Sequence, residues 1–172
     1  RDPAAVSSDD RDTIDAAGVT GAAAPDQLPA GPDESRPERP SLTGSSNEIS
    51  FARHACEHRF AAGSWIEPGP VDVWIRLTVP VVAGEEPTPL QRTVAAADFG
   101  NGVSSVLPWD RYLFINPDLT VHLARAAAGE WIGLRSVTRV GDAGAGLAES
   151  SLHDVEGTIG RSLQSLFVAP RT

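Results

Sequence analysis

The sequence has 172 residues, of which 41% are hydrophobic, and it carries a formal net charge of −9. This length allows one or at most two domains, and the acidic charge argues against non-specific binding to nucleic acid or to anionic membranes. No apolar run approaches the roughly 18 residues that span a membrane, and no signal-peptide hydrophobic region is present, so we expect a cytoplasmic protein.

The sequence divides into a predicted disordered linker, residues 1–50, and a folded domain, residues 51–172. The first 50 residues contain ten acidic residues, four arginines and six prolines but few large apolar side chains. Such a composition cannot offset the entropy that the chain loses on ordering. A short helix over Asp10–Ala17 is the one element that this segment suggests. Because the chain lacks methionine and begins with arginine, we expect it to be a piece of a longer protein or to start downstream of the true start.

Two strands and a helix open the folded domain. A first strand is expected over Arg53–Ala61. The segment VDVWIRLTV, Val71–Val79, alternates between two faces with a period of two residues, which predicts a second strand. A helix over about residues 89–101 follows, because Thr88 can cap it, a proline fits its first position and Gln91 completes a capping box.

Four further strands complete the domain: Tyr112–Arg125 with a break at Pro117, Trp131–Val140, Ala145–His153 and Thr158–Val168. The short loops between them favour antiparallel neighbours. One helix among about six antiparallel strands predicts an α+β domain in which a curved sheet wraps around the central helix.

The stretch AAADFGNG, residues 95–102, places one carboxylate, Asp98, among small side chains at the end of the predicted helix. A carboxylate there needs a hydrogen-bonding partner or a function. Asp98 could simply cap a turn with nearby backbone amides, and turn chemistry and strand hydrogen bonds could equally explain Asn116 and Gln164.

These polar residues could instead converge from three elements beside the end of the helix. Asp98 would then act as a general base on a water molecule, which Gln164 and a polar group from the Asn116–Thr120 segment would orient. This chemistry requires no covalent intermediate, metal or cofactor.

Other kinds of site lack support in the sequence. His54 and His58 lie four residues apart in a predicted strand, where this spacing is about 13 Å and too long for one metal ion. Cys56 is the single cysteine, which excludes an internal disulfide and a cysteine-rich metal site. The sequence contains no nucleophile elbow, P-loop or dinucleotide-binding fingerprint.

Six segments resemble, in order and spacing, the acyl-CoA thioesterase II family, the TesB-like double-hotdog thioesterases. The segments are VWIRL, AAADFGNG, NPDLTVHLAR, GEWIGLRS, GLAESSLHDVEG and IGRSLQSLFVAPR. They correspond to the C-terminal hotdog of that family, in an actinobacterial-type variant. The resemblance implies a hotdog fold and hydrolysis of acyl-CoA thioesters, as in fatty-acid metabolism, without a cofactor.

The resemblance also implies site residues. The acid of the family falls on Asp98, its glutamine on Gln164, its hydroxyl residue on Asn116, and a serine of many members on Thr120. An amide thus replaces a hydroxyl at Asn116, and Leu119 replaces a histidine. Because the family carries two hotdogs per chain and forms its sites between them, we expect a second hotdog unit as partner, either in a homodimer or as a missing N-terminal half.

Two alternatives stay open. The departures at Asn116 and Leu119 also fit a non-catalytic hotdog that binds acyl groups or mediates dimerisation. Another hotdog chemistry, enoyl-CoA hydration, would need a histidine near the helix, and His122 is the candidate for it.

Overall fold

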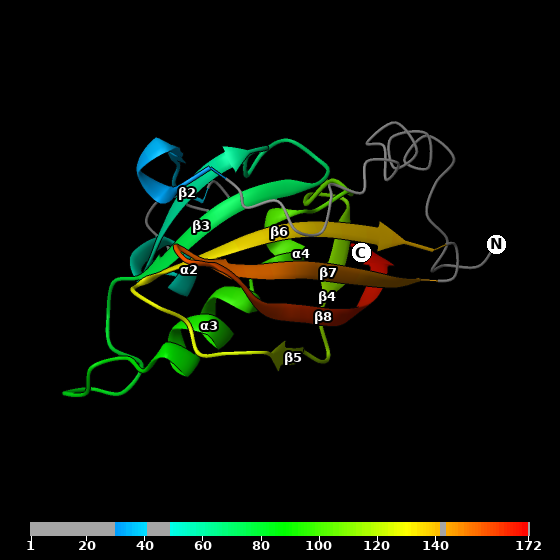
Figure 1. The fold of residues 1–172 in the computed structure, drawn as a ribbon. Coiled ribbons are helices and arrows are strands. Elements are labelled where there is room, and N and C mark those ends of the chain that lie inside the picture. The colour runs from blue at the N-terminus through cyan, green and yellow to red at the C-terminus, as the bar shows by residue number, and fades with distance from the viewer. Residues whose placement is uncertain (1–29, 41–48, 142–143, 172) are drawn as a thin grey trace.

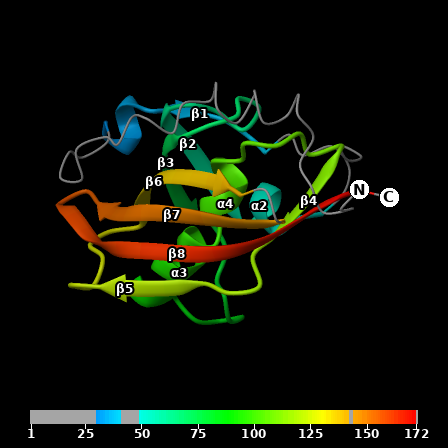
Figure 2. The same ribbon diagram turned by 90° about the vertical axis from the view of Figure 1, so that its right-hand side faces the viewer.

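The computed structural model describes residues 30–40, 49–141 and 144–171, and within them eight strands form one antiparallel sheet (Figures 1 and 2). The strand order is β1-β2-β3-β6-β7-β8-β4, and β5 also pairs with β8. The strands are β1 (Arg36–Pro37), β2 (Cys56–Ala62), β3 (Val71–Leu77), β4 (Tyr112–Ile115), β5 (Thr120–Leu123), β6 (Trp131–Val140), β7 (Ala145–Asp154) and β8 (Gly157–Pro170). The helices are η1 (Pro32–Glu34), α2 (Phe51–His54), α3 (Pro89–Ala97) and α4 (Gly100–Val103).

The helices α3 and α4 lie on one face of the curved sheet (Figures 1 and 2). α3 begins with the predicted capping box, in which the Thr88 hydroxyl accepts a hydrogen bond from the Gln91 N–H and the Gln91 side chain accepts one from the Thr88 N–H. Thr93, Ala96 and Ala97 are buried and belong to the side of α3 that faces the sheet. Such small side chains let the helix approach the sheet closely. The predicted α+β architecture, a sheet wrapped around a central helix, is therefore confirmed.

β3 shows why the two-residue period was informative. Its alternate residues Val71, Val73, Ile75 and Leu77 are all buried, as the period predicts. Trp74, on the opposite face, is also only 1% exposed, and its indole N–H donates a hydrogen bond to the backbone carbonyl of Ala30. A segment far upstream in the sequence therefore covers the outer face of this strand.

That segment, residues 30–40, lies inside the predicted linker. The Arg59 guanidinium contacts the Asp33 carboxylate at 3.1 Å, and the Trp65 N–H donates to the Glu38 carboxylate at 3.0 Å. Polar contacts and the covering of Trp74 thus hold this part of the chain, although the segment itself has no large apolar side chain that would have indicated an ordered region. The rest of the predicted linker, residues 1–29 and 41–48 with the suggested helix at Asp10–Ala17, lies outside the described residues.

Several element boundaries differ from the prediction. The predicted helix over residues 89–101 is interrupted after Ala97. There the Phe99 N–H donates a hydrogen bond of 3.1 Å to the carbonyl of Ala96, three residues earlier in the chain. The first predicted strand begins only at Cys56, because Ser50 caps the short helix α2 before it. The strand expected over 112–125 is two strands, β4 and β5, and with β1 the sheet has eight strands rather than about six.

His58 is a buried histidine without a hydrogen bond. It is 2% exposed, its ring contacts Trp65 and Phe99 edge to face, and neither of its ring nitrogens has a partner among the described residues. Burial lowers the pKa of His58 from 6.5 to about 4, although the nearby Glu57 carboxylate opposes this effect. The unfolded chain therefore binds a proton at His58 between these two pH values, whereas the folded protein does not.

We expect His58→Phe to remove part of the acid sensitivity of the fold. The stability tied to neutral His58 is complete above pH 6.5 and is lost as the pH falls from 6.5 to about 4, by about 3 kcal/mol. Phenylalanine supplies the aromatic contacts without a titrating group. Urea unfolding at several pH values should thus show a flatter profile over this range for His58→Phe, while exposed His54→Phe keeps the wild-type slope. Parallel profiles for wild type and His58→Phe would contradict this origin of the acid sensitivity.

Candidate functional site

Asp98 and Asn116 meet at the end of α3. Asp98 directly follows the last residue of the helix, and its side chain is exposed. Its Oδ1 accepts a hydrogen bond of 2.9 Å from Nδ2 of Asn116, which lies in the loop between β4 and β5. Among the described residues, the other carboxylate oxygen of Asp98 accepts no hydrogen bond. One oxygen is thus held by an amide while the other is open to a ligand or a water molecule.

Gln164 contacts the turn that follows Asp98 from the side of the sheet. It lies on the inner face of β8 and is 1% exposed. Its Nε2 donates to the backbone carbonyl of Asp98 at 3.1 Å, and its Oε1 accepts from the backbone N–H of Asn101 at 3.0 Å. The Gln164 amide therefore bridges both ends of the break between α3 and α4 and fixes the position of Asp98.

Buried hydroxyl groups support this turn from the sheet. Ser136 on β6 and Ser150 on β7 lie opposite each other, with their hydroxyl oxygens 2.7 Å apart. Ser104, just after α4, similarly pairs with Thr138 on β6 at 2.8 Å. Sequence reasoning did not identify these residues, because their pairing depends on the register between strands rather than on any local pattern.

Gly100 allows Gln164 and Ser150 to lie directly under the turn. A Cβ atom at Gly100 would be 2.9 Å from Ser150 Oγ and 3.1 Å from Gln164 Oε1. Real Cβ atoms do not approach other atoms this closely without displacing them. The glycines of AAADFGNG are thus the sequence signal that could have indicated this contact.

Gly100→Ala is expected to lower the free energy of unfolding by about 1–3 kcal/mol, because overpacking displaces the side chains beneath it. Urea unfolding followed by circular dichroism measures this change. Gly102→Ala in the same helix is the matched control, since its Cβ would have its nearest neighbour, Trp65, at 4.0 Å. It should be neutral or slightly stabilising, as alanine favours helix over glycine. Equal effects of the two substitutions would contradict the close contact at Gly100.

Thr120 does not lie beside Asp98, Asn116 and Gln164. It pairs with Leu163 on β8, whose side chain is exposed, whereas the next residue, Gln164, faces inward. Paired residues share one face of a sheet, so Thr120 lies on the outer face. His122, two residues along β5, lies on that outer face as well and is exposed.

Asp118 fixes the loop that carries Asn116. Its Oδ1 accepts a hydrogen bond of 2.9 Å from the backbone N–H of Ser165 on β8. Hydrogen bonding from Ser165 lowers the pKa of Asp118. The loop between β4 and β5 is therefore attached to the strand that also carries Gln164, which holds the two amide side chains in a fixed relation.

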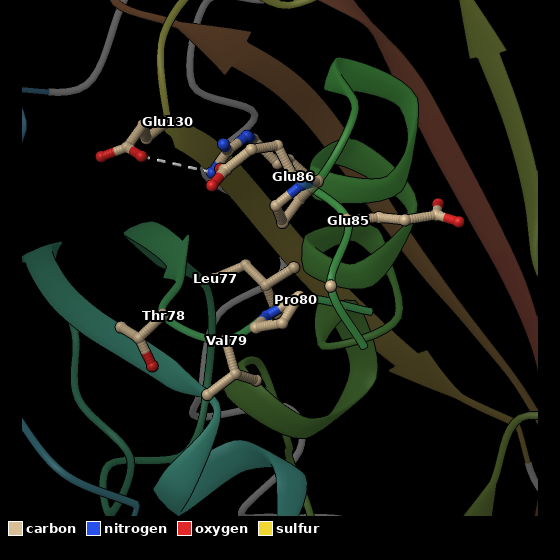
Figure 3. A pocket seen from close by; sticks show the side chains of 10 residues that line it. Leu77, Thr78, Val79, Pro80, Glu85, Glu86 and Glu130 are labelled. Atoms are coloured by element: carbon tan, nitrogen blue, oxygen red, sulfur yellow. Dashed lines mark hydrogen bonds and ion pairs between the residues drawn. The ribbon is translucent and has the colours of Figure 1, made fainter. Parts of the chain in front are cut away.

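A hollow of about 370 Å³ beside the start of α3 does not include these residues. Figure 3 shows Val79 and Pro80 on one side of it and Glu130 on another. The Glu130 carboxylate is 3.5 Å from the Arg92 guanidinium and 3.6 Å from that of Arg76. Glu85 and Glu86 also line this hollow, so its lining is net acidic, and none of Asp98, Asn116 and Gln164 faces it. Within the described residues, no group of three or more histidine, cysteine and acidic side chains could hold a metal ion.

Comparisons with known proteins identify the family of the chain and its fold. The model of the family described as acyl-CoA thioesterase C-terminal domain matches residues 25–168. No curated protein matches the sequence. None of the described helices is long and apolar enough to cross a membrane.

Two solved structures share the fold. A candidate thioesterase II from Thermobifida fusca YX has a TM-score of 0.56 and 18% identity, over 86% of this chain and 55% of that one. A candidate thioesterase from Novosphingobium aromaticivorans DSM 12444 has a TM-score of 0.52 and 19% identity, over 88% of this chain and 55% of that one. The chain thus spans little more than half of either protein. With the family match over most of its length, the chain belongs to the acyl-CoA thioesterase C-terminal domain family, and its fold is a hotdog.

Proposed function

We propose that this protein hydrolyses acyl-CoA thioesters, with Asp98 as the general base. The observation that carries the proposal is the contact between Asp98 Oδ1 and Asn116 Nδ2 at 2.9 Å, which leaves the second carboxylate oxygen of Asp98 open. Family membership supports the thioester as substrate class. The cytoplasmic location expected from the sequence stays a prediction.

The reaction needs three groups in fixed relation. The open oxygen of Asp98 takes a proton from a water molecule as the water oxygen attacks the thioester carbon. Asn116 orients the carboxylate and offers its amide to the same water. Gln164 acts as a positioning residue, because both ends of its amide hold the backbone around Asp98. Thr120 is assigned no step, because it lies on the other face of the sheet.

Attack of the water oxygen on the thioester carbon gives a tetrahedral intermediate, which then breaks down. The bond between carbon and sulfur breaks, and Asp98 returns its proton to the departing thiolate. The products are a carboxylic acid and free coenzyme A. Because water is the nucleophile, the mechanism needs no covalent acyl-enzyme.

A second hotdog unit is proposed to complete the site. Asp98 is exposed at the surface, and the two structural relatives are nearly twice as long as the matched region. The partner would be a second copy or a separate N-terminal half. The mass of the protein in solution, by light scattering with and without acyl-CoA, distinguishes a dimer from a monomer.

The direct test is thiol release from acyl-CoA, followed with a thiol-reactive dye. Release that is proportional to enzyme and stoichiometric with free fatty acid is the expected result. Binding of acyl-CoA without turnover over a range of chain lengths would instead favour the non-catalytic acyl-binding module. One observation favours that alternative. The side-chain oxygen of Gln164 already accepts a hydrogen bond from the backbone N–H of Asn101.

A further inference from the structure

Aromatic side chains surround the residue that follows Asp98. The ring of Phe99 meets the rings of His58 and Trp65 edge to face, with their centroids 5.0 and 6.3 Å away. Phe51 stacks on Phe99 with the two centroids 6.1 Å apart. We call Phe51, His58, Trp65 and Phe99 the aromatic cluster. The candidate base is therefore joined, in the chain, to a side chain with three aromatic neighbours.

Three different parts of the fold supply the neighbours of Phe99. Phe51 lies in α2, His58 in β2 and Trp65 in the loop between β2 and β3. His58 and Trp65 are buried, and their own rings meet edge to face at 5.1 Å. Because closely packed interiors leave buried rings little room to move, these two rings form a fixed frame for Phe99.

The polar atoms of this frame do not stabilise the fold through hydrogen bonds. Both ring nitrogens of His58 and the Nε1 atom of Trp65 are buried and have no hydrogen-bond partner among the described residues. A buried polar group without a partner costs free energy. The favourable contribution of His58 and Trp65 is thus the packing of their rings, and edge-to-face pairs of this kind fix the orientation of the rings that they join.

Asp98 lies where a helix is least stable on its own. It follows the last residue of α3, and the end of a helix frays most easily. Gln164 holds the backbone there through its hydrogen bonds with the Asp98 carbonyl and the Asn101 N–H. Phe99 lies in the chain between these two points, and its ring packs against the hydrophobic core. The packed ring therefore helps to keep the last turn of α3 from unwinding.

The backbone conformation links the direction of the Phe99 ring to that of the Asp98 carboxylate. Both residues have helical angles, φ −64° and ψ −20° at Asp98 and φ −76° and ψ −9° at Phe99. Successive side chains of a helix point roughly 100° apart. With the Phe99 ring directed into the aromatic cluster, the Asp98 side chain is exposed and reaches Asn116. A displaced ring would turn the carboxylate away from Asn116.

We propose that Phe99 is a positioning residue for Asp98, and that the aromatic cluster holds its ring so that the Asp98 carboxylate meets Asn116 and the attacking water. This inference rests on the proposed function where it concerns the rate of the reaction. The contact between Asp98 and Asn116 can be followed without any substrate, so the positioning and the proposed function can be tested separately.

The side-chain amide signal of Asn116, in a nitrogen–proton correlation NMR spectrum of the full 172-residue protein, reports this contact. Asp98→Ala lacks the hydrogen bond and gives the reference position of the signal. Phe99→Leu keeps an apolar side chain but loses the ring, and its Asn116 signal should move most of the way toward that reference. Phe60→Leu is the matched control. Among the described residues, the buried Phe60 ring contacts Trp65 at 6.1 Å and no other ring, so this substitution should leave the Asn116 signal in place.

The rate of thiol release from acyl-CoA gives the second measurement. Phe99→Leu should lower kcat about 10- to 100-fold with little change in KM, because a misplaced base slows the chemical step and not the binding of substrate. His58→Ala should lower kcat in the same way, and His58→Phe, which restores a ring, should recover most of the loss. Phe60→Leu should keep the wild-type kcat below its melting temperature, although it loses stability. A merely structural role would make the Phe99 and Phe60 variants alike.

Each possible result supports or overturns the proposal. An Asn116 signal that stays in place in Phe99→Leu, or one that moves equally in Phe60→Leu, would overturn it, as would an unchanged kcat in Phe99→Leu. If the wild type hydrolyses no acyl-CoA of any chain length, the proposed function fails and the Asn116 signal alone decides the positioning. If Phe99→Leu does not fold, Phe51→Ala takes its place, because the Phe51 ring is 52% exposed. A smaller movement of the Asn116 signal in the same direction then supports the proposal, and no movement rejects it.

Discussion

Asp98→Asn is expected to lower kcat for acyl-CoA hydrolysis by about 100- to 10,000-fold, the range that a positioned general base contributes. Asparagine has nearly the same shape as aspartate and can still accept the hydrogen bond from Asn116, but its amide cannot take a proton from water. KM should change little, because the substitution removes a group that acts in the transition state. Steady-state thiol release over a range of substrate concentrations separates the two constants.

The control for this prediction is Asp110→Asn. Asp110 is also an exposed aspartate, and it lies in the segment just before β4. The same change in charge at this position should leave kcat unchanged. Thermal unfolding of both variants checks that the fold is intact, as Asp98 contributes its backbone rather than its side chain to the contact with Gln164. Equal rates in wild type and Asp98→Asn would remove Asp98 from the mechanism.

The sequence allowed the architecture to be predicted where local chemistry determines it. The alternation in β3 and the capping box at Thr88 are local patterns, and both elements are found where they were expected. The cover over Trp74 was not predictable in this way. It consists of a backbone carbonyl at Ala30 and of polar contacts from a segment without large apolar residues, and no local pattern in that segment indicates them.

The candidate site was predictable only in part, for a similar reason. Asp98, Asn116 and Gln164 come from three elements, and the structure brings all three to one turn. Thr120 was expected there too, but the pairing of β5 with β8 sets which side chains face inward. Because side chains alternate along a strand, a shift of one residue in register exchanges the two faces. Sequence alone does not determine that register, and so Thr120 could not be assigned to a face.

The resemblance to a known family contributed what local chemistry could not. The spacing between the helix end and the last strand suggested that Asp98 and Gln164 belong to one site, although 66 residues separate them. It did not suggest that the Gln164 amide forms a hydrogen bond with the backbone at each of its two ends. That detail follows from the break between α3 and α4, which a continuous helix would not have.

Asp154→Ala is expected to lower the free energy of unfolding by about 1–3 kcal/mol, because it removes the shared acceptor of the Arg125 guanidinium and of three backbone N–H groups. Asp154 is fully buried, and its carboxylate accepts a hydrogen bond of 2.7 Å from the Arg125 guanidinium. It also accepts hydrogen bonds from three backbone N–H groups, those of Ala128 at 2.7 Å, Glu156 at 2.9 Å and Gly157 at 3.0 Å. One side chain thus organises both the turn between β7 and β8 and the loop after β5. Urea unfolding measures the loss, and Glu156→Ala, at an exposed acid 4.0 Å from Arg125, should change stability by no more than about 0.5 kcal/mol.

The pH dependence of folding gives an independent measure of the same carboxylate. Burial by itself would raise the pKa of Asp154, but the hydrogen bonds from Arg125 and from the backbone outweigh it and lower the pKa from 3.8 to about 2. The unfolded chain therefore takes up a proton at a higher pH than the folded protein, so the stabilising contribution is complete above pH 3.8 and is lost as the pH falls through about 2. Asp154→Asn should remove this step from the stability profile in acid. A wild-type step that persists in Asp154→Asn would show that another carboxylate is responsible.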